Sequence, residues 1–237
     1  MEYQEQYQAY LAQAMTALDA ACARFLPETS EVCRAARYSL LGGGKRIRAV
    51  LVLSVCEMLG GDPQAAQAFA AAVEMLHCYS LIHDDLPCMD NDDLRRGRPS
   101  CHKAFGEATA MLAGDVLLTE AFEVIANAPA APQSCVRAAR ALGAGAGSCG
   151  MVYGQELDLK YEALAASEEQ LRQIHRNKTG ALINAAVQMG AAAADADPRQ
   201  CEALEAYAYG LGLVFQIVDD GCDQHAGAAG QAHWQRC

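Results

Sequence analysis

The segment at residues 84–98, DDLPCMDNDDLRRGR, is the strongest local signal of chemistry in the chain. Its five aspartates follow an apolar stretch with helical period, and their mutual repulsion is unfavourable without bound cations. Mg²⁺ prefers oxygen ligands and is usually held by one or two carboxylates together with substrate phosphates. The three arginines that follow supply paired donors for phosphate oxygens. The apolar helix directly before it favours a metal and phosphate site over the alternative, a solvated loop of mixed charge.

A second carboxylate group, Asp219 and Asp220, follows the apolar stretch 211–218. On a continuing helix, Asp219 and Asp223 share a face because they are four residues apart. This spacing is a weak signal by itself. Two carboxylate clusters at the ends of apolar helices are more specific, because together they could bracket a diphosphate with several metal ions between them.

Basic residues gather in the glycine-rich segment 42–48, GGGKRIR. Its glycines allow the backbone to approach an anion closely, and Lys45 and Arg48 lie at the start of the next predicted helix. The spacing of a Walker P-loop is absent, so a loop that happens to be basic is the alternative.

Three further polar residues accompany apolar helices. His77 stands two turns before Asp84 on the same predicted helix, and it could face the same cavity. A lone helical histidine is more often a core or surface residue, so its assignment depends on the neighbouring motifs. Lys178 and Thr179 open another apolar helix and could supply phosphate donors.

Apolar residues repeat with the period of a helix along much of the chain, most clearly in residues 65–83. Scarce aromatic residues and abundant alanine also favour helices over strands. We expect helices near residues 4–25, 30–41, 46–59, 65–83, 107–127, 132–142, 167–194 and 198–220, joined by loops that carry glycine and proline. No linker or internal repeat divides them, which predicts one all-α domain.

Composition restricts the partners of the protein. The net charge of −11 argues against nucleic-acid binding, which requires a basic surface. The first residues lack the basic and apolar regions of a secretory signal, and polar residues interrupt every apolar run that approaches the length of a membrane span. The eleven cysteines are odd in number and show no CxxC spacing, which indicates reduced thiols and a cytoplasmic location.

Six tracts of the chain resemble the ordered signature blocks of the trans-prenyl diphosphate synthases, closest to the bacterial farnesyl diphosphate synthases. They are GGGKRIR, HDDLPCMDNDDLRRGRPSCHKAFGE, MLAGDVLL, GQELDL, NKTGALI and FQIVDD, and they run in family order from Tyr38 to Asp220. The resemblance implies an isoprenoid-synthase-type helical bundle around a central apolar cavity, and a homodimer. It also implies small-molecule diphosphate substrates and Mg²⁺ as cofactor, with Mn²⁺ as an alternative.

The resemblance assigns roles to individual residues. Asp84, Asp90 and Asp219 match metal ligands, and Asp85 and Asp220 match supporting catalytic carboxylates. The residues that match the isopentenyl diphosphate site are Lys45, Arg48, His77 and Arg96. Those that match the allylic diphosphate site are Arg95, Lys178, Thr179 and Gln216, and Lys178 is also counted as catalytic.

The implied reaction is departure of diphosphate from the allylic carbon, attack by the isopentenyl double bond and loss of a proton. Tyr79 and Ser80, shortly before Asp84, match the positions that set product length in the family. A tyrosine there favours farnesyl diphosphate, as does the Pro87-Cys88 insertion in the first aspartate motif. Geranylgeranyl diphosphate is the alternative product, and simple core packing is the alternative role of Tyr79.

The end of the chain departs from the family pattern. Residues 221–237 lack an apolar period and do not match the family's continuation, and they look like a shifted reading frame of it. We therefore expect a synthase domain at residues 1–220 without its last helices, and a disordered tail at 221–237. A folded but inactive synthase, a noncatalytic partner subunit and a terpene cyclase are the other hypotheses. The cyclase has no need of the GGGKRIR block.

Overall fold

Helices dominate the computed structural model of the chain, which describes residues 2–161, 164 and 166–227, with side chains only up to residue 215. The helices are α1 (Tyr3–Phe25), α2 (Glu31–Leu40), α3 (Ile47–Met58), α4 (Pro63–Asp84), α5 (Cys101–Phe105), α6 (Glu107–Ala126), α7 (Pro132–Ala146), α8 (Met151–Tyr161), α9 (Glu168–Ile174), the π-helical segment η1 (His175–Gly180), α10 (Ala181–Ala193) and α11 (Pro198–Gly227). The two short strands β1 (Leu94–Arg95) and β2 (Arg98–Pro99) form one antiparallel hairpin. The expected all-α class is confirmed.

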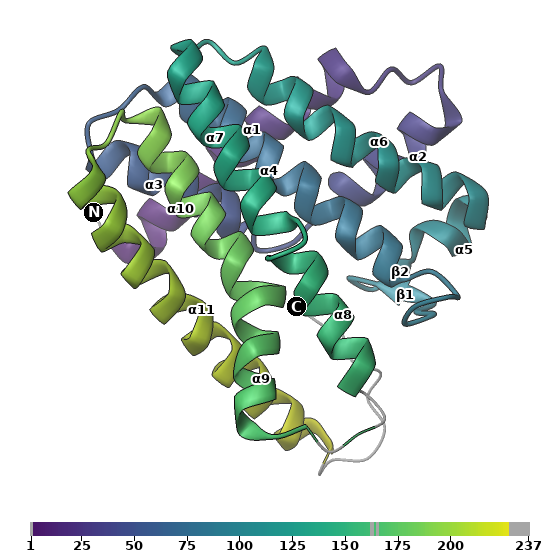
Figure 1. Cartoon of the computed structure of the whole chain (residues 1–237). Helices are drawn as coiled ribbons and strands as arrows, with labels where there is room; N and C mark the ends of the chain where they lie inside the picture. Colours follow the sequence, from purple (N-terminus) through teal and green to yellow (C-terminus); the bar gives the residue numbers. More distant parts are fainter. Residues whose placement is uncertain (1, 162–163, 165, 228–237) are drawn as a thin grey trace.

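Helix α4 lies in the middle of the bundle and carries the site towards one end (Figure 1). It packs against α1, α2, α3, α6 and α10. It is apolar on nearly every side, and Phe69, Met75 and Leu76 are fully buried. Its many alanines let neighbouring helices approach closely. By length and composition α4 is also apolar enough to cross a membrane, but 72% of the qualifying window is buried inside the protein. That burial is typical of a core helix.

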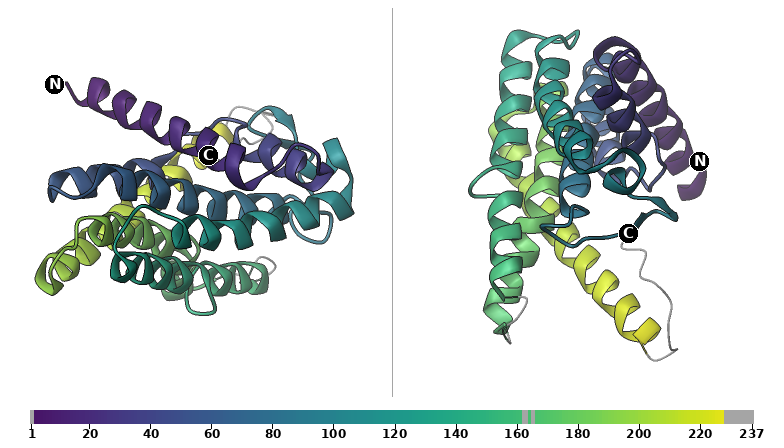
Figure 2. Two further views of the ribbon diagram at one scale, coloured as in Figure 1. Left: turned by 90° about the horizontal axis from the view of Figure 1, so that it is seen from above. Right: turned by 90° about the vertical axis from the view of Figure 1, so that its right-hand side faces the viewer.

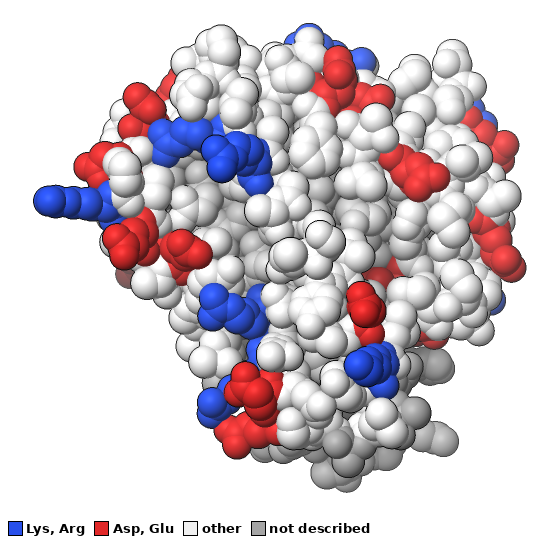
Figure 3. Space-filling view, in the orientation of Figure 1, with Lys and Arg blue, Asp and Glu red and all other residues white. Residues whose placement is uncertain are grey.

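The bundle is layered around α4. Seen from above, α1 runs along one side, α3, α4 and α6 form the middle, and α7 and α10 cover the opposite side (Figure 2). On the face shown in Figure 3, basic side chains lie in small groups interspersed with acidic ones, and the centre of the face is largely uncharged. This face offers no extended basic surface of the kind that nucleic acids require.

Local sequence signals fix several helix starts. Ser30 accepts a hydrogen bond from the backbone of Cys33, and Asp62 caps α4 with Pro63 at the first helical position. Ser167 and Gln170 form a capping box at α9.

Three expectations about the helices need correction. No helix was expected at 151–161, where α8 lies, because its short and glycine-containing sequence has little apolar period. The helix expected at 167–194 forms as the uninterrupted run of α9, η1 and α10, but its middle part, η1, is π-helical rather than α-helical. Helix α11 continues to Gly227 rather than ending at Asp220. A single glycine such as Gly221 costs only about 1 kcal/mol in a helix, and no proline follows it in residues 222–227. The boundary at 220 therefore falls inside a helix, and residues 228–237 of the expected tail lie outside the described part.

Candidate active site

Asp84 is the last residue of α4, and the acidic segment folds back over this helix end. The backbone N–H of Asp90 donates to the Asp84 carbonyl at 2.8 Å, which holds the two motif aspartates next to each other. Burial raises the pKa of the Asp84 carboxyl from 3.8 to about 6, the positive charge of Lys178 opposes this rise, and Asp90 adds to it. The carboxylate at the helix end is thus destabilised and close to a second carboxylate, as expected of a group that binds a cation.

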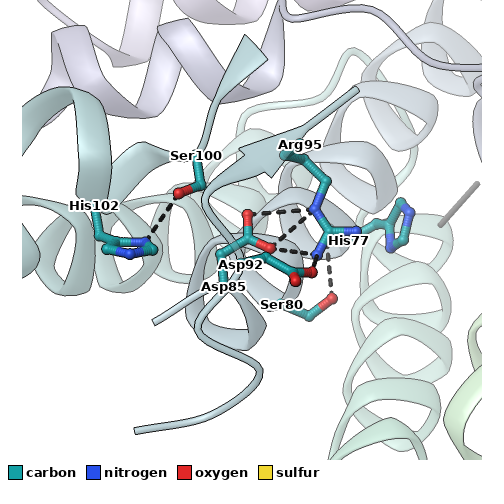
Figure 4. Close-up of polar contacts among 7 residues, drawn as sticks. All are labelled: His77, Ser80, Asp85, Asp92, Arg95, Ser100 and His102. Carbon is teal, nitrogen blue, oxygen red and sulfur yellow. Dashed lines mark hydrogen bonds and ion pairs between the residues drawn. The ribbon is translucent and has the colours of Figure 1, made fainter. Parts of the chain in front are cut away.

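Asp85 is buried and binds Arg95 rather than facing the solvent (Figure 4). The Nε atom of Arg95 donates to Asp85 at 3.0 Å, a terminal nitrogen donates to the same carboxylate, and Asp92 lies 3.5 Å from that nitrogen. Because Arg95 belongs to β1, this ion pair ties the β1–β2 hairpin to the end of α4. In this structure Arg95 contacts protein carboxylates, although the resemblance gives it an allylic diphosphate.

The hairpin turn places Arg96 against the glycine-rich loop. Arg96 and Gly97 both have positive φ, the conformation that a two-residue hairpin turn of this hand needs. The Arg96 guanidinium donates to the backbone carbonyl of Gly43. A Cβ atom on Gly44 would lie 2.7 Å from the Arg96 Cζ atom, and Gly44 has a φ of +116°. The glycines are therefore required for this close approach, and the two basic blocks of the sequence meet here.

Arg48 joins Arg96 in a cationic cluster beside this loop, and the neutral His77 lies next to the two arginines. Burial lowers the pKa of His77 well below 6.5, and the charges of Arg48 and Arg96 lower it further. Burial also lowers the pKa of Arg48. Within the described residues, the Arg48 Nε and His77 Nδ1 atoms are buried and lack a hydrogen-bond partner. Two arginines beside a neutral histidine, with buried nitrogen atoms that lack partners, form a site that an anion would stabilise. Lys45, three residues before Arg48, has an exposed side chain.

Lys178 faces this end of α4 from the π-helical segment η1. Its Nζ atom donates to Asp158 of α8 at 2.5 Å. A Cβ atom on Gly154 would lie 2.1 Å from the Lys178 backbone nitrogen, so only glycine allows α8 and η1 to touch there. Asp158 lies one turn after Gly154 on α8, and this position brings its carboxylate to the Lys178 ammonium. Thr179, the next residue of η1, is buried.

The two residues expected to control product length lie on α4 before Asp84. Tyr79 is buried, and its ring packs edge-on against His83 with ring centroids 5.6 Å apart. His83 in turn lies against α6, at 2.9 Å from the Met111 carbonyl. The Ser80 hydroxyl donates to the His77 carbonyl at 2.9 Å (Figure 4). Tyr79 is near the aspartates, since the Asp84 charge contributes to raising its pKa, after burial.

The side chains of Gln216, Asp219 and Asp220 lie outside the described residues, so the expected second carboxylate cluster has only its backbone helix, α11. Within the part that is described, no three His, Cys, Asp or Glu side chains form a metal-binding group. The structure brings Asp84, Asp90 and Lys178 together, and separately Arg48, His77 and Arg96.

Two residues next to the site were not identified from the sequence. Asp158 binds Lys178, and its signal was its place in the GQELDL tract, one turn after a glycine. Glu74 is a buried acid close to Arg46. Its signal was that it is the only acidic residue within the apolar stretch 65–83.

Comparison with known proteins agrees with this arrangement. A family model described as Polyprenyl synthetase matches residues 29–231, and the chain belongs to this family. Among solved structures, a geranyltransferase from Legionella pneumophila superposes with a TM-score of 0.88 at 42% identity, over 94% of this chain and 80% of that one. An FPP/GFPP synthase from Zymomonas mobilis gives a TM-score of 0.84 at 38% identity, over 95% and 82% of the two chains.

Curated relatives have more than one product in their names. The chain is 48% identical to geranylgeranyl pyrophosphate synthase 3 of Arabidopsis thaliana, over 84% of this chain and 57% of the relative. It is 45% identical to farnesyl diphosphate synthase of Geobacillus stearothermophilus, over 90% of this chain and 74% of the relative. The chain spans 54–60% of the length of the plant relatives that it matches.

Proposed function

We propose that this protein is a Mg²⁺-dependent prenyltransferase that condenses isopentenyl diphosphate with an allylic diphosphate. The observation that carries the proposal is the arrangement of two opposite kinds of charge along one face of α4. Asp84 with Asp90 stands at the helix end, and His77 stands two turns earlier beside Arg48 and Arg96. Seven residues of helix span about 10 Å. With that spacing, a metal-bound diphosphate can lie at the carboxylates, and a second diphosphate can lie at the arginine side chains without a metal ion.

The donor set fits a divalent cation. Asp84 and Asp90 supply carboxylate oxygens, and the raised pKa of Asp84 reflects a burial cost that a bound cation would offset. Asp219, supported by Asp220, is the proposed ligand from α11. Mg²⁺ would neutralise the charge that develops on the departing diphosphate.

On the allylic side, Lys178 is the proposed donor to the diphosphate, and Thr179, Gln216 and Arg95 are proposed as further donors. Asp158 holds the Lys178 ammonium at the site end of η1, so the donor is positioned before substrate binds. The diphosphate oxygens of the substrate would compete with Asp158 for the Lys178 ammonium. The ammonium can then pass from one negatively charged acceptor directly to the other.

On the isopentenyl side, Arg48, Arg96 and His77 hold the second diphosphate, with Lys45 at the rim. His77 binds as a neutral imidazole at neutral pH, since burial and the arginines disfavour its charged form. The isopentenyl double bond attacks the allylic cation, and the released diphosphate accepts the proton that is lost. The apolar side chains of α4 and its neighbours exclude water that would otherwise capture the cation.

Farnesyl diphosphate is the proposed product, because the buried Tyr79 ring occupies the position before Asp84 where a growing chain would extend. Geranylgeranyl diphosphate is the second candidate, favoured by the names of the plant relatives. Chromatography of dephosphorylated products decides between the C15 and C20 alcohols.

A homodimer is also proposed, supported by the exposed Met111 and Leu112 on α6. A cytoplasmic location is proposed because the nine cysteines whose side chains the structure describes are free thiols, as in a reducing compartment. A role as one subunit of a heterodimer is a further candidate, since one relative is named as the large subunit of a heterodimeric enzyme.

The class of reaction is tested by diphosphate release with both substrates. We expect release in Mg²⁺ only when isopentenyl diphosphate and dimethylallyl or geranyl diphosphate are both present, and none in EDTA. Replacing Asp84 and Asp90 by Ala should abolish release with little loss of helix content, because both residues lie at a helix end. No release by the unaltered protein under these conditions would overturn the assignment.

A further inference from the structure

Glu74 is a buried acid in the middle of α4, and its side chain is only 2% exposed. One carboxylate oxygen lies 3.3 Å from a terminal nitrogen of Arg46, whose side chain is 1% exposed. The other oxygen accepts the backbone N–H of Ala49 at 3.1 Å. The second terminal nitrogen of Arg46 donates to the backbone carbonyl of Leu40, the last residue of α2. One buried ion pair therefore connects α2, α3 and α4.

These contacts replace a missing helix cap. Arg46 is the N-cap residue of α3, it has a φ of 52°, and its own side chain makes no capping hydrogen bond. The first N–H groups of a helix have no partner within the helix. Glu74 satisfies one of them, that of Ala49, from a different helix. The cap stabilises the first turn of α3, which carries Arg48.

The same ion pair restricts the conformational freedom of the glycine-rich loop at residues 42–45. Leu40 precedes the loop and Arg46 follows it, and the two are joined through the Arg46 guanidinium. Gly43 and Gly44 have φ values of +92° and +116°, which few other residues adopt, and this loop is intrinsically free to rearrange. Fixing both ends of the loop removes most of that freedom.

The negative charge of Glu74 should weaken anion binding, whereas the positioning role should strengthen it. Its negative charge lies behind the cationic cluster and stabilises the charged forms of Arg48 and Arg96. A buried carboxylate near an anion site repels the incoming anion. If Glu74 acted only through its field, neutralising it would strengthen anion binding. If it acts by positioning, neutralising it would weaken binding. The two effects have opposite signs.

We propose that Glu74, through Arg46 and the Ala49 amide, is a positioning residue that orders the glycine-rich loop and Arg48 for the diphosphate of isopentenyl diphosphate. The inference rests on the proposed function of the arginine cluster. Glu74 does not touch the substrate. Glu74 keeps the hydrogen-bond donors in place before the anion binds. The entropy cost of ordering the loop is then met during folding and does not weaken binding.

The test is calorimetric titration with inorganic pyrophosphate in EDTA, where the metal-dependent half of the site is inactive. We expect Glu74→Gln to raise the Kd by about tenfold, because the amide cannot accept from both Arg46 and Ala49. Glu57→Gln is the matched control, since it removes the same charge from an exposed side chain in the last turn of α3. The control should bind as the wild-type protein does. Equal or tighter binding by Glu74→Gln would overturn the proposal.

Glu74→Asp separates geometry from charge and also serves if Glu74→Gln does not fold. It keeps the negative charge but shortens the side chain by one methylene, so we again expect weaker binding, and unchanged binding would count against positioning. In the wild-type protein, hydrogen exchange should show a protected Ala49 amide, and rapid exchange there would overturn the cap. If the wild-type protein binds no pyrophosphate in EDTA, the arginine half of the proposed function fails, while the exchange result still decides the cap.

Discussion

Replacing Asp84 by Asn should stabilise the metal-free protein while removing a proposed metal ligand. Burial raises the pKa of this carboxyl, so ionisation is less favourable in the folded protein than in the unfolded chain. Below pH 3.8 the group is protonated in both states and costs nothing. As the pH rises towards 6 the unfolded chain ionises first, and stability is lost until the folded form ionises as well. Above pH 6 the loss is constant.

The magnitude follows from the pKa. A pKa moved from 3.8 to about 6 corresponds to about 3 kcal/mol in the free energy of unfolding. The Asp84 side chain is half-buried and keeps some solvent contact, so we expect about half of that value. For a domain of this size, about 1.5 kcal/mol raises the Tm by roughly 3–6 °C.

The assay is thermal unfolding in EDTA at several pH values between 4 and 8, for the wild-type protein and Asp84→Asn. The variant should gain stability progressively between pH 4 and 6 and then keep a constant advantage. Asp19→Asn, on an exposed position of α1, is the control and should show no such pH dependence. A variant that is less stable than the wild-type protein at pH 8 would refute the argument that Asp84 is held at a cost.

Three further changes test the positions of other site residues. Gly154→Ala would place a Cβ atom 2.1 Å from the Lys178 backbone, so we expect a loss of about 1–3 kcal/mol in thermal unfolding and a higher KM for the allylic substrate; unaltered unfolding would contradict the close packing. Asp85→Ala leaves the largely buried Arg95 with only the more exposed Asp92 as partner, which should cost about 3 kcal/mol in urea unfolding, and an unchanged midpoint would show that the ion pair with Asp85 contributes little. Tyr79→Ala opens space beside Asp84, so products longer than C15 should appear by chromatography, whereas an unchanged product would mean that Tyr79 only packs in the core.

Helices with strong local signals could be predicted from the sequence. Helix α4 was expected because its apolar residues keep the helical period, and its end near Asp84 was expected because Pro87 follows. The acidic segment and the glycine-rich loop were likewise visible as composition. In each case the information lies within a short stretch of chain.

Contacts between distant segments could not be predicted in this way. The ion pair of Lys178 with Asp158 depends on how α8 packs against η1, and this packing depends on a glycine whose missing side chain leaves no local pattern. The capping of α3 by Glu74 depends on a helix that lies elsewhere in the chain. In the sequence, nothing in the stretch 65–83 shows which helix its one acidic residue contacts.

Two binding titrations test directly whether the two halves of the proposed site hold two diphosphates in different ways. Geranyl diphosphate should bind only with Mg²⁺ and lose affinity when Asp84 and Asp90 are replaced by Ala. Isopentenyl diphosphate should bind in EDTA as well, and lose affinity when Arg96 is replaced by Leu but not when the two aspartates are replaced. If both ligands required Mg²⁺ and responded to the same substitutions, the division of the site into a carboxylate half and an arginine half would be contradicted.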